Sequence, residues 1–560
     1  MKAAYCYKQL KTGSVRFPRT DFVPPCAPQK VIPVPTNVYV TNIGDLPVRL
    51  FFTFNYPMKG SDYFNFLISN LTNRTSVAQR YQPAPIYNIG GLIVENQYSI
   101  AVQAVIDGIP REFSIATEPF VPGYGILQFT KRHAYAAQVD SVIIPDLVPG
   151  GPPIGYIAQR TASAICIDRQ NNLVLVLADG ITKQGYMLKY TNTGTRVFSS
   201  AITLPTGFTP YAVTTDSNSD IYIAGYDTTD YSFVTVVTPG LVKLSGVDGS
   251  LLKRSSNNDL AGGYFTGITL TNTAIFLCGF TVSDIGIVQS FVLSKDLNFG
   301  DLALDTRPSF SDPDTGYISV ARGICIDSLG RPIVVGYLQT PDQATTQYFM
   351  SIYEPTTLQR YFYFTHGAER RQTVGESIAL CPDGSVVICG STTGPLDNVG
   401  IVGSGGENAF VTKYDFSNYT TVDDLVSLDE NLPLVWTKRL GSTEPGTSTR
   451  ALGVAVDSLG GVYAVGETSG GIAPFSQMGD MGDLFVAKYD ASGRQKYINQ
   501  NGSTNFLPFL SATFANSVAI NSYNDFFIGG VSDGIRYDEI TNPAGTYVPS
   551  IFVSKYSATL

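Results

Sequence analysis

The sequence predicts an all-β protein: a seven-bladed β-propeller preceded by a small β-sandwich and an extended N-terminal arm. Two observations lead to this prediction. A cassette of three short strand-like runs recurs seven times between residue 162 and the C-terminus, and a repeat built only of strands is typical of four-stranded sheets arranged around a ring. Upstream, residues 30–120 alternate between apolar and polar side chains and are divided by turn residues, as in a sandwich. Helix signals are nearly absent, and 422–432 is the one candidate.

The first 29 residues contain prolines and basic side chains and show no helical period, so 1–29 is predicted to be an extended arm. Residues 30–120 then hold five strand-like runs: NVYVTN (37–42), VRLFFTFN (48–55), YFNFLIS (63–69), YSIAVQA (98–104) and REFSIAT (111–117). Tyr98 lies six residues after Leu92 and opens the pattern Tyr-x-Ile-x-Val-x-Ala. This segment resembles a fibronectin type III domain, which implies a buried corner tyrosine at Tyr98 whose hydroxyl bonds to backbone near Leu92. Phe52 or Phe54 would replace the usual core tryptophan; another small sandwich of the same size is the alternative.

The propeller is predicted to occupy 121–560 and to be closed by an N-terminal strand. The last cassette ends with IFVSKY (551–556) and lacks the fourth run that most earlier copies have. ILQFTKR (126–132) resembles PLVWTKR (433–439), with Phe129 where Trp436 stands. We therefore expect 126–132 to complete the seventh blade beside 551–556, which would leave no long unpaired edge. A chance match between two ordinary strands is the alternative.

Within each cassette, the three runs keep their lengths while the loops vary. The first runs are AICID (164–168), AVTTD (212–216), GITLT (267–271), GICID (323–327), SIALC (377–381), GVAVD (453–457) and SVAIN (517–521). Their small apolar residues suit an innermost strand that is packed on both faces. Most second runs end in a glycine, which lets a neighbouring backbone come close: Gly225, Gly279, Gly336, Gly390, Gly466 and Gly530, with Ala178 in copy one. Between the first two runs lie Asp, Asn and Gly, the chemistry of hairpin turns.

Copy six shows the whole motif most clearly. It contains Asp457, Gly460, Val462, Tyr463 and Gly466, followed by Phe485, Val486, Ala487, Lys488, Tyr489, Asp490 and Gly493. This pattern resembles the SBBP-type β-propeller repeat of large surface proteins. The resemblance covers most of the chain after residue 162 and is weakest in copy three, where Lys295 is followed by Asp296. It implies a propeller scaffold and no particular reaction.

Composition narrows the choice of partner and compartment. The net charge is −9 with 15% charged residues, which argues against a nucleic-acid partner. No apolar run is long enough for a membrane span, and 1–18 lacks the apolar core of a secretory signal. Five of the seven cysteines lie on strand-like runs of mostly different blades, and Cys6 and Cys26 are the plausible pair. This suits folding in a reducing cytosol, whereas a surface rich in Thr, Ser, Asn, Gly and Tyr is typical of external exposure.

The sequence predicts no catalytic, cofactor-binding or metal-binding residues. His133 and His366 are the two histidines, and neither has a metal-ligand partner nearby in the sequence. No nucleophile elbow, phosphate-binding loop or paired-histidine motif stands in a fitting context. The turn 216–220 resembles half a calcium loop, and 311–316 resembles the aspartate box of sialidases without its aromatic end; both are expected to be turns.

The candidate partner-binding surface is a group of long loops. Loops that join second to third strands emerge on one face of a propeller, and they are long in blades five (391–408), six (467–483) and seven (531–550). Loops on a rigid scaffold are frequent recognition sites, and these carry apolar residues of the kind that protein partners cover. The candidate residues are Val399, Ile401, Ile472, Phe475, Met478, Met481 and Ile535.

These observations predict a non-enzymatic structural or interaction protein without cofactors. Its expected partners are other structural proteins of a capsid or surface assembly, and its expected location is a virion or another external surface. A surface adhesin or glycan-binding propeller is the alternative, and a propeller hydrolase or lyase is the least favoured.

Overall fold

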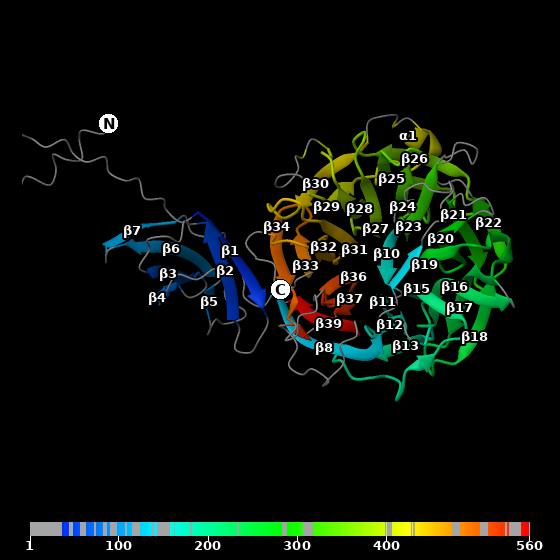
Figure 1. Cartoon of the computed structure of the whole chain (residues 1–560), viewed down its shortest axis with the longest axis horizontal. Coiled ribbons are helices and arrows are strands. Elements are labelled where there is room, and N and C mark those ends of the chain that lie inside the picture. Colours follow the sequence, from blue (N-terminus) through cyan, green and yellow to red (C-terminus); the bar gives the residue numbers. More distant parts are fainter. Residues whose placement is uncertain are drawn as a thin grey trace, which may run out of the picture.

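The computed structural model describes residues 36–558, apart from 44–48, 56–62, 72–73, 82–86, 90–97, 107–108, 115–123, 137–138, 143–156, 162, 180–181, 232–233, 283–287, 306–316, 398, 400–405, 427, 429–431, 473–481, 505–512, 533–534 and 537–549. The described chain is almost entirely β-strand, and it forms a ring of sheets with a smaller β unit beside it (Figure 1). The arm predicted for 1–29 lies outside the described residues.

The smaller unit contains two antiparallel sheets, as predicted for a β-sandwich. The first has the order β1 (Thr36–Ile43), β2 (Arg49–Asn55), β5 (Tyr87–Ile89), and the second has the order β4 (Thr75–Tyr81), β3 (Tyr63–Asn70), β6 (Tyr98–Ile106), β7 (Ile109–Phe113). Burial alternates along β3 because successive side chains point to opposite faces of the sheet, and one face is more covered than the other. Tyr98 is buried, and its hydroxyl accepts a hydrogen bond of 3.1 Å from the Asn70 side-chain amide. Leu92 lies outside the described residues, and the fibronectin type III identity stays a prediction.

The ring consists of seven antiparallel sheets of four strands each, and the strands of a blade are counted outward from the ring axis. Blades one to three contain β11 (Ser163–Ile167), β12 (Leu173–Ala178), β13 (Gly185–Tyr190), β14 (Ile202–Thr203); β15 (Phe208–Thr215), β16 (Ile221–Tyr231), β17 (Val234–Leu244), β18 (Leu251–Ser256); and β19 (Tyr264–Leu270), β20 (Ala274–Val282), β21 (Val288–Asp296), β22 (Asp301–Asp305). Blades four and five contain β23 (Ile318–Ile326), β24 (Pro332–Gln339), β25 (Thr346–Tyr353), β26 (Arg360–His366); and β27 (Thr373–Leu380), β28 (Val386–Thr392), β29 (Asn408–Tyr414), β30 (Leu434–Leu440).

Blades six and seven contain β31 (Thr449–Val456), β32 (Val462–Thr468), β33 (Asp483–Tyr489), β34 (Gln495–Asn501); and β36 (Thr513–Ile520), β37 (Phe526–Ser532), β39 (Ser550–Ala558), β8 (Tyr124–Ala136). Outside the blades, β9 (Val139–Val142) pairs with β10 (Ile157–Thr161), and β35 (Ser503–Thr504) pairs with β38 (Ile535–Arg536). The helices are η1 (Asn258–Leu260) and α1 (Val422–Val426), so the helix expected over 422–432 forms at its start. No helix within the described ranges is both long and apolar enough for a bilayer span.

The blades are held together by apolar clusters that each draw on two neighbouring sheets. The cluster around Ile333 and Ile388 joins blades four and five, and the cluster around Leu175 and Val553 joins blade one to blade seven. Second strands such as β12 are buried on every residue because both faces of their sheet are covered. Packing therefore continues around the whole ring.

The ring is closed by a strand from the N-terminal side, as the sequence predicts. In the seventh blade β8 pairs antiparallel with β39, and Phe129 stands opposite Lys555. The sandwich lies beside this closure, with β1 next to β8 and to β34 of blade six (Figure 1).

The cysteines on the strand-like runs are free thiols. Cys278, Cys325, Cys381 and Cys389 are buried, and Cys166 is half-buried. Burial raises the pKa of Cys389 well above its ordinary value, so this thiol stays protonated at neutral pH. Cys6 and Cys26 lie outside the described residues.

Candidate functional site

The predicted loop surface is only partly described, and one of its residues belongs to the core. Ile472 is 3% exposed and packs in the apolar cluster between blades five and six, with its backbone N–H donating to the Gln500 side chain at 2.8 Å. The prediction that Ile472 is an exposed contact residue is therefore wrong, because the chain folds back onto the blade there. Val399 is half-buried, and Ile535 lies in β38. The remaining candidates lie outside the described residues: Ile401, Phe475, Met478 and Met481.

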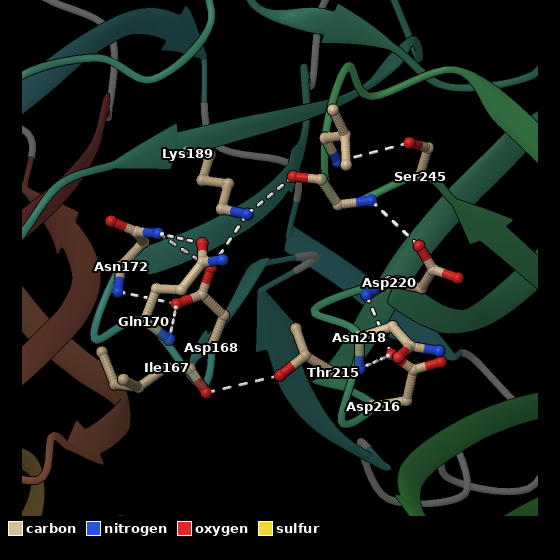
Figure 2. Close-up of polar contacts among 12 residues, drawn as sticks. Ile167, Asp168, Gln170, Asn172, Lys189, Thr215, Asp216, Asn218, Asp220 and Ser245 are labelled. Atoms are coloured by element: carbon tan, nitrogen blue, oxygen red, sulfur yellow. Dashed lines mark hydrogen bonds and ion pairs between the residues drawn. The ribbon is translucent and has the colours of Figure 1, made fainter.

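The opposite face of the ring carries the turns between first and second strands; we call it the turn face. In most of these turns one side chain organises the backbone. Asp168 accepts hydrogen bonds from the backbone N–H groups of Gln170 and Asn172, both at 2.8 Å (Figure 2). Asp457 accepts from Leu459 and Gly461 in the same way. An aspartate that bonds its own backbone fixes such a turn.

Aspartates of these turns pair with the lysine near the end of the third strand. Lys189 Nζ lies 2.8 Å from Asp168 Oδ2, and the side chains are 1% and 0% exposed (Figure 2). Lys189 also donates to the carbonyl oxygen of Gly246 in blade two, at 2.9 Å. In blade six Lys488 pairs with Asp457 at the same turn position. In blades two, five and seven the lysine lies nearest to a later aspartate of the turn: Lys243–Asp220, Lys413–Asp383 and Lys555–Asp525. The lysine of the repeat motif thus ties a turn to its own blade and, in blade one, to the next blade.

Burial and hydrogen bonding act in opposite directions on Asp168. Burial favours the neutral acid, but hydrogen bonds from Lys189 and Asn172 favour the carboxylate and outweigh it, so the pKa of Asp168 is lowered. The Asp168 carboxylate is therefore charged at neutral pH, and its hydrogen bonds and ion pair hold the turn in place.

Apolar side chains are exposed at the tips of several of these turns. The third residue of the turn is Leu329 in blade four, Leu459 in blade six and Tyr523 in blade seven, with exposures of 49%, 67% and 63%. The other exposed large apolar residues within the described part of the propeller lie in turns after third strands or in the outermost segments that follow: Val197, Val247, Leu251, Leu252, Leu302, Leu304, Leu434 and Val435. Three turns of the turn face thus carry an exposed apolar side chain at their tips.

A second feature lies at the ring axis, where the first strands of six blades carry a β-bulge. In blade four Ala321 pairs with Gly336 and Gly323 pairs with Val335, so Arg322 is the extra residue. The bulged residues of the six blades are Tyr211, Thr266, Arg322, Glu376, Leu452 and Asn516. Such bulges re-aim a side chain and are frequent beside functional sites.

The glycine that ends the second run makes room for the bulge. A Cβ atom at Gly466 would lie 1.8 Å from the carbonyl oxygen of Arg450, and one at Gly336 would lie 2.0 Å from that of Val320. In blade one the register shows Leu177, and not Ala178, at the glycine position, and Ser163 pairs with it without a bulge. The glycine therefore goes together with the bulged residue at the axis.

Two bulged residues of opposite charge meet in blades four and five. The Arg322 side chain is 3% exposed, and its Nε lies 3.6 Å from Glu376 Oε2. This distance allows an ion pair but is too long for a hydrogen bond, and Nε and Nη2 of Arg322 have no hydrogen-bond partner in the structure. The guanidinium also lies over the ring of Tyr337, 5.6 Å from its centroid.

Further charges of blades five and six extend this cluster. Arg450 donates from Nε to Glu407 at 2.7 Å, and its Nη1 lies 3.7 Å from Glu467. Burial raises the pKa of Glu467; Arg450 opposes this rise, whereas the charges of Glu407 and Glu376 add to it. Because these charges act on one another, we treat Arg322, Glu376, Glu407, Arg450 and Glu467 as one group, the axial cluster.

The axial cluster matches none of the site residues predicted from the sequence. Each bulged residue directly precedes the first run of its cassette, as Arg322 precedes GICID and Glu376 precedes SIALC. A variable, often polar residue before a constant apolar run is the signal that could have found it. His366 ends β26 as expected, with Nε2 at 2.7 Å from Asp397, and His133 lies within β8. In the part of the chain that the structure describes, no three His, Cys, Asp or Glu side chains are grouped to hold a metal ion.

Comparison with known proteins supports the scaffold. The model of the SBBP family, described as a beta-propeller repeat, matches residues 435–473, which run from β30 through β32. No curated protein sequence matches the chain. Among solved structures, a quinonprotein alcohol dehydrogenase-like protein from Bacteroides thetaiotaomicron is 10% identical with a TM-score of 0.32, over 83% of this chain and 96% of that one.

Two further solved structures are named as enzymes. The α-L-arabinofuranosidase Arb93A from Fusarium graminearum is 11% identical with a TM-score of 0.36, over 62% of this chain and 92% of that one. A GH43_1 enzyme from Xanthomonas citri is 10% identical with a TM-score of 0.29, over 63% and 88%. The expectation that this protein is not an enzyme is accordingly corrected, because similar structures are glycoside hydrolases. At such low identity the likeness concerns the fold alone, and what the matches support is a β-propeller that carries an SBBP-type repeat.

Proposed function

We propose that this protein is an interaction scaffold, in which a rigid propeller presents an apolar turn face to another structural protein. The observation that carries the proposal is the repeated exposure of Leu329, Leu459 and Tyr523 at one turn position. Solvated turns ordinarily carry polar side chains, as Gln170 and Asn218 do at the same position of blades one and two. An apolar residue at a rigid, exposed tip is suited to burial against a partner.

The rigidity of the turn face supports the same proposal. Asp457 holds the turn that bears Leu459 and is itself held by Lys488 at 3.1 Å. A preorganised surface loses little conformational entropy on binding, so more of the contact energy appears as affinity. The long loops of blades five to seven, with their remaining candidates such as Phe475 and Met478, are proposed as a second contact surface on the other face.

The proposed setting is a virion or another external surface, reached after folding in a reducing cytosol. Free buried thiols such as Cys278 and Cys389 fit synthesis in that compartment. The proposed partners are structural proteins of the particle or envelope.

The test is association of the protein with the particle or envelope isolated from its source. The triple variant Leu329→Lys, Leu459→Lys, Tyr523→Lys should fold and lose co-sedimentation with the particle, because three desolvated contacts become charged. The matched control is Gln170→Lys, Asn218→Lys, which adds charge at the same turn position without removing an apolar contact, and it should sediment as the wild type does.

Association that survives in the triple variant would show that the turn face is not the contact surface. Shortening the loops 391–408, 467–483 and 531–550 then tests the second surface by the same sedimentation assay. If neither change reduces association, the interaction proposal is wrong.

A further inference from the structure

The axial cluster contains hydrogen-bonding groups that the protein itself leaves unused. Arg322 is almost wholly buried, yet its Nε and Nη2 lack hydrogen-bond partners. These two groups form one edge of the guanidinium fork, which binds two neighbouring oxygen atoms side by side. The bulged residue of blade seven, Asn516, likewise has a buried side-chain oxygen with no donor. Buried polar groups are ordinarily satisfied, so an unfilled fork at the axis requires an explanation.

The carboxylates around the fork restrict what can fill it. Glu376 lies 3.6 Å from Arg322 Nε, and its charge also acts on Arg450 and Glu467. With three glutamates against two arginines, the axial cluster has a formal charge of −1 when all five are ionised. A second anion such as phosphate would accept from Arg322 but would be repelled by Glu376. A hydroxyl group accepts from a guanidinium and donates to a carboxylate at the same time.

We propose that the axial cluster is a binding site for a neutral saccharide, with adjacent hydroxyl groups bridging Arg322 and Glu376. Adjacent hydroxyls match the spacing of the guanidinium fork, and each can donate its proton to a carboxylate oxygen. Arg450 Nε already donates a hydrogen bond to Glu407 at 2.7 Å, and this pair holds the outer edge of the proposed site in place.

Exposure falls from one end of the axial cluster to the other. Arg450 and Glu467 are partly exposed, whereas Glu376 and Arg322 are nearly buried. The exposed end of the axial cluster, at Arg450 and Glu467, is therefore the side from which a ligand would approach Arg322. Aromatic rings continue beyond it: Tyr337 lies under the guanidinium, and in blades two and three Tyr211 and Tyr264 stack with centroids 6.0 Å apart. Aromatic faces beside hydrogen-bonding groups suit a ring that is polar at its edge and apolar on its face.

The experiment is saturation-transfer NMR on the full chain with a panel of neutral mono- and disaccharides, followed by titration calorimetry for the sugars that bind. The wild type should bind at least one sugar, and inorganic phosphate should not compete. Glu376→Gln keeps the shape of the side chain but removes the charged acceptor, and it should weaken binding by about tenfold or more, the loss expected for a hydrogen bond to a charged group. Arg322→Met should abolish binding.

Glu369→Gln is the matched control, since Glu369 is an exposed glutamate that follows the fourth strand of blade four, outside the axial cluster. It should bind as the wild type does. If Arg322→Met fails to fold, Glu376→Gln decides, with unchanged circular dichroism as proof of its fold. The proposal is wrong if no sugar binds the folded wild type, if Glu376→Gln binds unchanged, or if phosphate binds and sugars do not. The triple turn-face variant should keep sugar binding, so this test is independent of the interaction proposal.

Discussion

At the scale of single residues, the turn aspartate and the motif lysine form the most buried ion pair among the described residues. Asp168 and Lys189 are fully removed from water, which is costly for two charges unless each finds further hydrogen bonds. Asn172 and the backbone of its turn supply these bonds to Asp168, and the Gly246 carbonyl supplies one to Lys189. The pair therefore specifies the position of the turn rather than adding large net stability.

Removal of one partner should be strongly destabilising. Lys189→Met leaves the Asp168 carboxylate buried beside an apolar group, and we expect a loss of about 3 kcal/mol in the free energy of unfolding. Lys496→Met is the control, because Lys496 lies 3.5 Å from Asp490 at the surface, and such exposed pairs contribute less than about 1 kcal/mol. Urea unfolding of both variants measures the difference. Equal losses would show that burial of the ion pair has no special effect.

Acid should weaken the fold through the same carboxylate. Because the pKa of Asp168 is lower in the folded protein than in the unfolded chain, its contribution is fully present above the ordinary aspartate value of about 3.9 and is lost as the pH falls through the lower folded value. The stability difference between wild type and Asp168→Asn should therefore shrink from pH 5 downward. Urea unfolding across this range checks it; a difference that stays constant would contradict the assigned charge.

At the scale of elements, the first strand and the glycine of the second strand form one device. The glycine leaves room for a carbonyl oxygen of the neighbouring strand, and that strand bulges by one extra residue. Where blade one has Leu177 in place of glycine, the strand pairs regularly. The blades can therefore carry different residues at the bulge while the arrangement of their strands stays the same.

Substitution of such a glycine should disturb the bulge. In Gly466→Ala the new methyl group would lie 1.8 Å from the Arg450 carbonyl oxygen, so the strand must shift, at a cost of about 1–3 kcal/mol. At Gly482 the nearest atom to a new Cβ lies 3.4 Å away, and Gly482→Ala should be nearly neutral. Thermal unfolding compares the two. A shift of the strand would also move Arg450, so sugar binding at the axial cluster should fall in Gly466→Ala alone.

The strands and turns also show why the sequence predicts the propeller scaffold better than it predicts the axial cluster. The turn residue at Asp457 and the glycine at Gly466 recur in most copies because those blades share the same turn and the same close contact. Blade one lacks the glycine, and blade four lacks the lysine that stands at Lys488. The bulged residues differ in every blade, since the ring does not need a particular side chain there, and so no repeat reveals them. Arg322 and Glu376 meet because the first strands of blades four and five lie side by side near the axis. The burial of Ile472 is also hard to predict, because a residue in a long loop can pack back into the core. Ile472 does so where its backbone N–H donates to the Gln500 side chain.

At the scale of the whole molecule, closure by β8 joins the first and last strands of the propeller in one sheet. Seven interblade packing surfaces then form an uninterrupted circle, and β39 has partners on both sides. The number of repeats and the absence of a fourth run in the last repeat predict this closure, because the last sheet of the ring would otherwise have an unpaired strand edge. The identity of the sandwich was harder to predict, since several small sandwiches share its alternating pattern.

Two truncations should separate the sandwich from the ring. Deletion of 1–120 keeps β8 and should leave a folded, monodisperse propeller. Deletion of 1–136 also removes β8, exposes the edge of β39 and should cause aggregation, because unpaired strand edges recruit other chains. Light scattering distinguishes these outcomes. A soluble, monodisperse 1–136 deletion would mean that another segment can cover the edge.

The closing pair also sets the order in which the protein can be completed during synthesis. The strand β8 is made before the first six blades, and its partner β39 is made after them. Six blades can assemble from neighbouring segments as they emerge, whereas the seventh must wait for β39 and close a loop of nearly the whole chain. Contacts between such distant segments form slowly. The nascent protein therefore has an open sheet edge until β39 has been made and can pair with β8.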